Sequence, residues 1–395
     1  MIAIKNGKIN TITGGVLDKG VILIENGKIA AVGEDVNIPD DAEIIDASGC
    51  YVTPGLIDCH THICLMSEPK TMPSLESETN EKSTPVTPYV RALDALNPFD
   101  YAVEKVRNAG FTTVYTGPGS VNVIGGTGLS IKLRGLTADE MAIPGSEQMK
   151  MALGENPKRI YGLNQKSPVT RMGTAALIRR TLFQARLYSD KLLAAGSNKE
   201  GTPAPDFELD SLVPVVRGEM KVRFHCHRAD DIATAIRIAE EFKLKYSIEH
   251  ATDGTRIKEL LAEKDVFVVV GPLLLEPNKQ ETLNINLETA GELEKAGVTK
   301  LCLMADTASK TQWLPIEIGL LLRRGLSEDM AFRAVTINAA KNLELEDRIG
   351  SIEKGKDADL AIFDGHPFHN TTLCRMTMID GVIYHNTLEQ KKEEV

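Results

Sequence analysis

The pattern of hydrophobic and polar positions at the two ends of the chain predicts short β-strands. Met1–Ile9 and Val21–Ala30 each carry an Asn-Gly pair between apolar residues, and this pair is a strong signal of a tight hairpin turn. Ala358–Phe363 and Met376–Tyr384 have a similar pattern, with Asp-Gly as the turn in the second. Neither end could bury much apolar surface alone. We therefore expect residues 1–53 and 347–395 to form one small β-sandwich domain together.

Between the two ends, strand-like segments alternate with helical ones. Asp231–Phe242 has apolar residues at a helical period, and Thr170–Ala195 is long and rich in helix formers. Eight strand candidates fall in the region 54–346, which predicts an α/β fold of the (β/α)8 TIM-barrel type. A doubly wound open sheet is the alternative, although no Gly-X-Gly-X-X-Gly follows the first strand. The candidates are Leu56–His60, Thr112–Thr116, Leu129–Arg134, Gln148–Leu153, Lys221–Cys226, Lys245–Glu249, Val266–Val270 and Lys300–Met304.

Two segments are too long to be simple connections between such elements. They are Cys64–Leu96, after the first predicted barrel strand, and Lys158–Gly218, after the fourth. Segments that follow barrel strands lie on the catalytic face. Both segments are therefore candidates for covering a site there.

Composition and charge narrow the classes of function. The 395 residues are 42% hydrophobic and 25% charged, with a net charge of -10, which argues against nucleic acid as a partner. The sequence predicts no membrane partner, because no apolar stretch reaches the roughly 20 residues of a spanning helix. Without a signal-peptide pattern or a Cys-X-X-Cys spacing among the six cysteines, we expect free thiols and a cytoplasmic protein.

A pair of histidines ends the first predicted barrel strand. His60 and His62 are two residues apart, so on an extended strand their side chains point to the same side. Neutral imidazole is a good ligand for zinc and similar divalent ions. The pair is therefore half of a candidate metal site, and two polar residues that merely close a strand are the alternative.

Further candidate ligands lie at the ends of other predicted strands. His225 and His227 end the fifth strand, His250 the sixth and Asp306 the eighth, so that five of the eight histidines fall at three strand ends. The fourth strand carries Lys150 among apolar residues, where a lysine is costly unless it is paired or modified. Imidazoles and a carboxylate suit one or two divalent cations. A neutral lysine amine can also react with carbon dioxide to give a carbamate that bridges two cations.

These motifs resemble the amidohydrolase superfamily over nearly the whole chain. The resemblance is carried by Pro54–His62, by the strand-end histidines with Asp306, and by the tail segments 336–342 and 349–360. Within the superfamily, the chain looks most like imidazolonepropionase-related hydrolases, a group that includes metal-dependent dipeptidases. The resemblance implies a barrel with a small β-domain from both termini.

The resemblance also implies a set of metal ligands. His60 and His62 would bind the more buried ion, and His225 and His250 the more exposed one. Lys150, N6-carboxylated, would bridge the two ions. Asp306 would bind metal and shuttle the proton. Zinc leads the candidate metals, and some relatives hold a single ion without a bridging lysine.

We therefore predict a metal-dependent hydrolase that cleaves a C–N bond of a cyclic amide or a small peptide-like substrate. A metal-activated hydroxide would attack, and Asp306 would accept its proton and deliver it to the leaving nitrogen. Deamination of a heterocycle on the same scaffold is one alternative. A non-catalytic scaffold protein is another, although such proteins have usually lost ligands. The sequence leaves open whether the chain forms a homo-oligomer.

Four residues are candidates for contacts with the substrate. His227 faces the same way as His225, and Asn122 lies in the glycine-rich run after the second strand. Arg171 and Arg91 are candidates for holding a substrate carboxylate through a bidentate contact. A structural or surface role is the alternative for each of the four.

Overall fold

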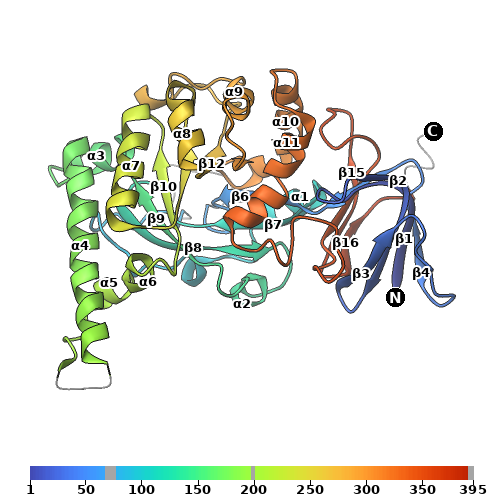
Figure 1. The fold of residues 1–395 in the computed structure, drawn as a ribbon, viewed down its shortest axis with the longest axis horizontal. Coiled ribbons are helices and arrows are strands. Elements are labelled where there is room, and N and C mark those ends of the chain that lie inside the picture. Colours follow the sequence, from blue (N-terminus) through green and yellow to red (C-terminus); the bar gives the residue numbers. More distant parts are fainter. Residues whose placement is uncertain (67–76, 197–200, 390–395) are drawn as a thin grey trace.

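An eight-stranded sheet forms the centre of the protein. The computed structural model describes residues 1–66, 77–196 and 201–389. The central strands (Figure 1) are hydrogen-bonded in chain order from β6 to β13, and these two end strands contact each other. The result is a TIM-barrel-like α/β fold. Its strands are β6 (Leu56–Thr61), β7 (Phe111–Thr116), β8 (Ile124–Lys132), β9 (Gln148–Ala152), β10 (Val222–Cys226), β11 (Tyr246–His250), β12 (Phe267–Val270) and β13 (Leu301–Leu303).

Strand β8 departs from the regular barrel that the sequence predicts. It pairs with both β7 and β9 in the antiparallel direction, whereas the other pairs in this sheet are parallel. The cause is the short connection between Thr116 and Ile124, because a parallel crossover needs a dozen or more residues. The predicted strand Leu129–Arg134 therefore overlaps only the second half of β8, which already begins at Ile124 within the glycine-rich run before it, whereas residues 117–123 of that run form a loop.

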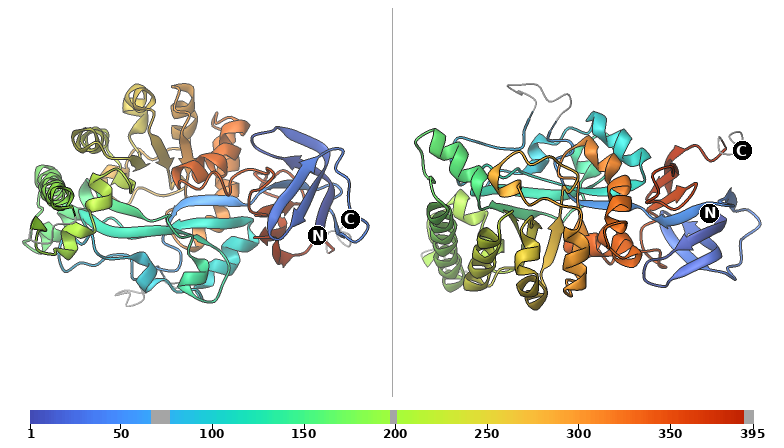
Figure 2. Two further views of the ribbon diagram at one scale, coloured as in Figure 1. Left: turned by 60° about the horizontal axis from the view of Figure 1, so that its bottom comes forward. Right: turned by 90° about the horizontal axis from the view of Figure 1, so that it is seen from above.

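Helices α4, α7, α8, α9 and α10 follow one another in an arc outside the strands (Figure 2). Two of them coincide with segments whose composition or period predicted a helix: α4 begins at Arg171 and α7 at Ala229. The helices are α1 (Tyr101–Asn108), α2 (Ala138–Met141), α3 (Glu155–Leu163), α4 (Arg171–Ala195), α5 (Phe207–Asp210), α6 (Val213–Val216), α7 (Ala229–Phe242), α8 (Lys258–Lys264), α9 (Thr289–Lys295), α10 (Leu314–Leu322), α11 (Glu328–Ala334) and α12 (Ile337–Asn342).

Strands from both ends of the chain make a second sheet. Its order is β16-β15-β14-β5-β1-β2-β3, with β4 paired to β1, so β5 and β14 join the two ends of the chain. The sandwich arrangement and the domain limits at residues 53/54 and 346/347 stay predictions. The strands are β1 (Ile2–Asn10), β2 (Val16–Glu25), β3 (Lys28–Gly33), β4 (Glu43–Asp46), β5 (Tyr51–Pro54), β14 (Leu360–Phe363), β15 (Cys374–Ile379) and β16 (Val382–Asn386).

Two of the three turns predicted in this sheet are present in the structure, and one is not. Asn26 and Gly27 form the tight turn between β2 and β3 with positive φ angles of 50° and 75°, as the hairpin geometry requires. Asp380-Gly381 does the same between β15 and β16. The turn predicted at Asn6 is wrong, because β1 continues through it and Asn6, with φ 65°, lies where the pairing with β2 shifts register.

Two further observations concern cysteines and membranes. All six cysteines are free thiols, as the sequence predicts. Within the described part of the chain, no helix is both long enough and apolar enough to pass through a bilayer.

A buried lysine connects the two sheets at the end of β8. The amine of Lys132 lies 2.7 Å from an oxygen of Asp357 and 3.1 Å from one of Asp359, and it also contacts Asp380. The Lys132 side chain is 1% exposed. The antiparallel direction of β8 places this amine at the base of the barrel, where it neutralises carboxylates from the chain's C-terminal part.

We predict that Lys132→Met destabilises the protein by about 3–5 kcal/mol, because the substitution leaves buried carboxylates without their cation. The free energy of unfolding in urea measures this loss. Lys28→Met is the matched control: Lys28 contacts the same Asp357, but its side chain is 49% exposed, so the expected loss is below about 1 kcal/mol. Equal losses in the two variants would contradict a special role for the buried amine.

Candidate metal centre

A cavity of about 280 Å³ opens at the carboxyl end of the central sheet. All five strand-end histidines line it, together with Lys150 and Asp306. Since parallel strands carry their carboxyl ends to one edge, residues distant in sequence meet there. The structure therefore brings together the seven residues that the strand pattern predicts for this face. They are His60, His62, Lys150, His225, His227, His250 and Asp306.

The buried Asp58 aligns the two chain segments on one side of the cavity. One carboxylate oxygen accepts the backbone N–H of His60 at 3.1 Å. The other accepts the N–H of Ala305 at 3.1 Å and the hydroxyl of Thr311 at 2.9 Å. Complete burial raises the pKa of this carboxyl to about 7. Asp58 thus fixes the end of β6 against the loop that carries Asp306.

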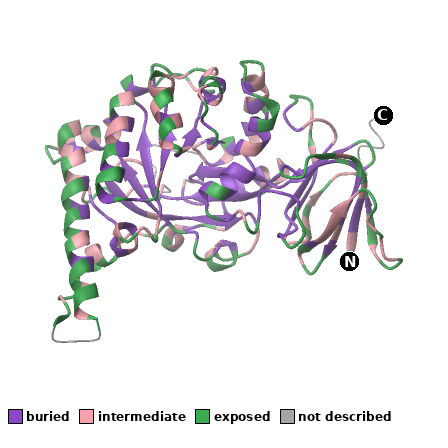
Figure 3. Cartoon of the chain, in the orientation of Figure 1, coloured by how far each residue is buried: buried purple, intermediate pink, exposed green. Residues whose placement is uncertain are grey.

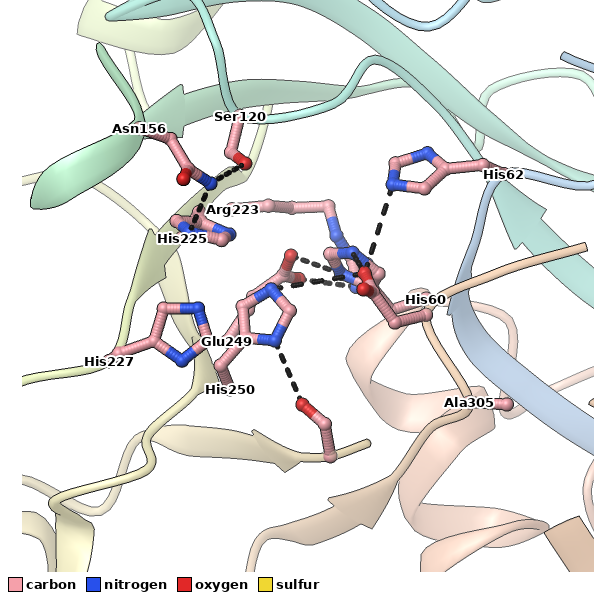
Figure 4. Close-up of polar contacts among 12 residues, drawn as sticks. His60, His62, Ser120, Asn156, Arg223, His225, His227, Glu249, His250 and Ala305 are labelled. Atoms are coloured by element: carbon pink, nitrogen blue, oxygen red, sulfur yellow. Dashed lines mark hydrogen bonds and ion pairs between the residues drawn. The ribbon is translucent and has the colours of Figure 1, made fainter. Parts of the chain in front are cut away.

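His60 and His62 point to the same side, as their spacing predicts. The Nε2 atom of His60 lies 3.2 Å from Oδ1 of Asp306, and that of His62 lies 3.8 Å from the same oxygen (Figure 4). The Nδ1 atom of His62 is 2.8 Å from the carbonyl oxygen of Gly117. A carbonyl only accepts, so Nδ1 carries the proton and Nε2 keeps its lone pair toward the cavity.

The other three histidines form a compact group across the cavity. The ring centre of His250 is 4.3 Å from that of His225 and 4.5 Å from that of His227. The Nδ1 atom of His250 lies 2.8 Å from the carbonyl oxygen of Gly271, so its Nε2 atom also keeps a lone pair. This Nε2 atom is buried without a hydrogen-bond partner among the described residues. The Nδ1 atom of His227 contacts the hydroxyl of Thr252 at 2.8 Å.

Burial keeps four of the five imidazoles neutral. It lowers the pKa of His62 to about 4 and the pKa of His250 to about 3. Burial also lowers the pKa values of His225 and His227 well below the ordinary value, and the neighbouring His250 adds to the effect. At neutral pH these four rings therefore offer lone pairs rather than positive charge.

The Asp306 carboxyl, in contrast to these neutral imidazoles, is held in its charged form. Loss of hydration raises the pKa of its carboxyl, but His250 and His60 outweigh that effect and hold the pKa well below its ordinary value. The side chain is 28% exposed, and its backbone has a φ of 67°, an uncommon conformation for a non-glycine residue. An anionic carboxylate is thus fixed at the cavity beside neutral imidazoles.

These donors fit a divalent cation in two overlapping groups. In one, ligand atoms of His60, His250 and Asp306 all lie within 4.8 Å of one another, and in the other those of His225, His227 and His250 do. His250 belongs to both groups, and its Nε2 atom is buried without a hydrogen-bond partner among the described residues. Neutral imidazoles with one carboxylate are a donor set for zinc, iron, manganese or similar ions.

Lys150 lies at the floor of the cavity, where a buried carboxylate accompanies it. Its amine is 3.0 Å from Glu249, which also contacts His60 and Arg223. The side chains of Glu249 and Arg223 are 0% exposed. Burial lowers the pKa of Lys150, and Glu249 opposes that shift. The sequence prediction did not include Glu249 and Arg223. The signal that identified Lys150, a charged residue within an apolar strand where burial is costly, is also present at these two positions.

The structure does not bring three of the predicted substrate contacts to the cavity. Asn122 is buried and donates to the carbonyl of Glu81 and to Thr87, which indicates a structural role. The Arg171 side chain binds Asp231. The Arg91 side chain is 61% exposed and binds Asp94. Each of these polar groups is engaged elsewhere.

The cavity has other polar residues that sequence reasoning missed. Lys279 binds Glu281 at 2.7 Å and the side-chain oxygen of Asn156 at 3.1 Å. Arg159, on α3, is exposed and lines the cavity, and no ion pair of its guanidinium occurs among the described residues. Lys279 and Arg159 both come from segments without a strand-end position, so the periodicity of the chain gave no signal for them.

Comparison with known proteins relates this chain to amidohydrolases. The model of the amidohydrolase family matches residues 51–385. An amidohydrolase of Hapsidospora irregularis is 29% identical over 392 residues, which cover 92% of this chain and 39% of that protein. The chain thus spans less than half the length of that relative.

Two further matches cover most of both partners. An imidazolonepropionase of Geobacillus sp. (strain WCH70) is 28% identical over 395 residues, which cover 88% of this chain and 84% of the relative. The crystal structure of an amidohydrolase from Thermotoga maritima MSB8 has a TM-score of 0.92 and 42% identity, and it covers 98% of this chain and 100% of that one.

The depressed histidine pKa values predict how stability depends on pH. A histidine in an unfolded chain has a pKa near 6.5. Between about pH 6.5 and 4, His62 and His250 are therefore protonated in the unfolded chain but neutral in the folded protein. Each of these two histidines therefore contributes a fall of about 1.4 kcal/mol per pH unit in the free energy of unfolding of the metal-free protein as the pH decreases. His225 and His227 contribute in the same direction, and the raised pKa of Asp58 contributes in the opposite direction. Urea unfolding between pH 7 and pH 4 measures the slope.

The variant His250→Gln should reduce this slope by about 1.4 kcal/mol per pH unit, since one proton is removed from the difference. His369→Gln is the control, because His369 lies exposed in the C-terminal part, and its slope should equal that of the unaltered protein. Identical slopes in the two variants would show that His250 is not held neutral.

Proposed function

We propose that this chain, which belongs to the amidohydrolase family and is related to imidazolonepropionases, hydrolyses a C–N bond of a cyclic amide or a small peptide-like substrate with divalent metal. The observation that carries the proposal is the meeting of five imidazoles and the Asp306 carboxylate around one cavity. Four of the imidazoles have depressed pKa values and can act as ligands at neutral pH.

The same residues would hold the metal. We assign one ion to His60 and His62 and a second to His225 and His250, with Asp306 as a further ligand. His227, whose ring lies 4.8 Å from that of His225, is close enough to bind or to orient a ligand. A divalent ion bound there, with zinc as the first candidate, would supply a Lewis acid that polarises a carbonyl and lowers the pKa of water.

The side chain of Lys150 can be either N6-carboxylated or an unmodified amine. As an N6-carboxylate, its side chain would bridge two ions, which requires the amine to lose its proton first. Burial favours the neutral amine, whereas the contact with Glu249 favours the charged one. A crystal structure of the metal-loaded protein tests the assignment, and an unmodified Lys150 directed away from the ions would overturn it.

Asp306 is the proposed proton carrier. Its carboxylate is ionised at neutral pH, lines the cavity and lies within 4 Å of three imidazole nitrogens. A carboxylate in this position can accept a proton from attacking water and return it to the leaving nitrogen, which makes a poor leaving group without a proton.

The cavity also indicates a class of substrate. Its volume of about 280 Å³ suits a small molecule. Apolar side chains, among them Val121, Ile160 and Leu275, line its walls. Arg159 adds a positive charge that has no ion pair among the described residues, whereas the charge of Lys279 is already balanced by Glu281. We therefore propose a small amide with an apolar part and a carboxylate that Arg159 binds.

The variant Asp306→Asn tests the proposed proton transfer. Turnover should fall by about a hundred- to ten-thousandfold, because the amide side chain cannot accept the proton. Metal content, measured by elemental analysis, should stay near that of the unaltered protein, since the histidine ligands remain. Asp41→Asn, in an exposed loop, is the matched control and should leave turnover unchanged. Unaltered turnover of the Asp306 variant would exclude the proposed role.

The variant Arg159→Met tests the proposed contact with a substrate carboxylate. It is screened with amides that carry a carboxylate and with neutral analogues of the same size. KM for the carboxylate substrates should rise about tenfold with little change for the neutral ones. Lys158→Met removes a neighbouring charge outside the cavity lining and should change neither. Ammonia release is followed in the same screen, and turnover confined to amino-heterocycles would favour the deaminase alternative.

A further inference from the structure

The outer face of helix α4 carries side chains that no described part of the chain covers. The helix lies at the edge of the molecule (Figure 1), and its exposed side faces away from the barrel (Figure 3). Its inner side is buried through residues such as Ile178, Leu182 and Ala185. On the outer side, Phe183 is 56% exposed and Leu187 is 47% exposed, so large apolar groups face solvent there.

The exposed residues follow a regular spacing. Successive members are separated by four, three, four, three and four positions, and all six are exposed. This spacing is that of the seam of a coiled coil, in which apolar positions repeat every 3.5 residues on average. We call this set the α4 stripe; it consists of Ala176, Arg180, Phe183, Leu187, Asp190 and Ala194.

We propose that the α4 stripe binds the α4 stripe of a second copy of this chain in the antiparallel direction, so that the protein is a two-fold symmetric dimer. A two-fold axis through the middle of the stripe places Phe183 opposite the partner subunit's Leu187, and Leu187 opposite the partner subunit's Phe183. A symmetric interface uses the same patch on both subunits, and this stripe is complementary to itself when reversed.

Charge determines the direction of the pairing. In the antiparallel arrangement, Arg180 lies opposite the partner subunit's Asp190, and the symmetry repeats this pair, so two opposite-charge pairs flank the apolar centre. In a parallel arrangement each of these residues would meet its own copy, which is repulsive. Within the described chain neither Arg180 nor Asp190 makes an ion pair of 4 Å or less, although the carboxylate of Glu208 interacts electrostatically with Arg180. Both exposed side chains can therefore pair with a partner subunit.

The ends and flanks of the stripe are compatible with close approach. Ala176 lies opposite the partner subunit's Ala194, and small side chains at both ends let the helices approach each other. On the flank, Arg179 would lie near the partner subunit's Lys191. The charge of Arg179 is already neutralised, because its guanidinium makes two hydrogen bonds of 2.8 Å to Glu241. The dimer is independent of the proposed reaction.

Sedimentation velocity over a range of concentrations tests the proposal on the whole chain of 395 residues. The unaltered protein should be a dimer at micromolar concentration. Arg180→Asp and Asp190→Arg should each raise the dimer dissociation constant by about tenfold or more, because each change creates two like-charge pairs per dimer. The double variant, with both changes, should recover the original constant, since it restores the opposite charges with their order exchanged.

Lys354→Asp is the matched control. It makes the same change of charge at an exposed position in the C-terminal part and should leave the dissociation constant unchanged. Circular dichroism confirms that each variant is folded, since the three substituted side chains are exposed. A monomeric unaltered protein would overturn the proposal. So would a dimer that neither single variant weakens, or a double variant no tighter than the single ones.

Discussion

The carboxylate of Glu249 is the contact on which the rest of the site depends. It is fully buried and touches Lys150 from β9, Arg223 from β10 and His60 from β6, while it belongs to β11 itself. The Arg223 guanidinium, the Lys150 amine and the Glu249 carboxylate share an interior where a single unpaired charge would be unfavourable. This cluster therefore fixes four strands in one register, and that register places the ligands above it.

A second buried ionic cluster stabilises the opposite end of the same sheet. Lys132, at the end of β8, neutralises Asp357 and Asp359 from the chain's C-terminal part. The reversal of one strand makes this contact, because a parallel β8 would direct that end toward the cavity. The cavity end of the central sheet thus carries the candidate metal ligands, whereas ion pairs at the opposite end attach the terminal sheet.

The sequence could predict much of the site because strand geometry is periodic. The spacing of His60 and His62 sets their common direction, and parallel strands bring His250 and Asp306 to the same edge. Other features depend on information that periodicity does not contain. The direction of β8 follows from the length of one connection, and Arg159 reaches the cavity from a helix. Asn6 resembled a turn because its residue type suits either a turn or a positive-φ position within a strand.

The backbone at two of the candidate ligands has a further consequence. His250 and Asp306 have φ angles of 71° and 67°, in the left-handed region where a side chain costs about 1 kcal/mol relative to glycine. Selection for stability alone would therefore favour glycine at both positions, and selection for activity opposes it. These two residues lie where evolution faces a trade-off between a relaxed chain and a reactive one. In a descendant that had lost the activity, His250 and Asp306 would be among the first residues to be substituted.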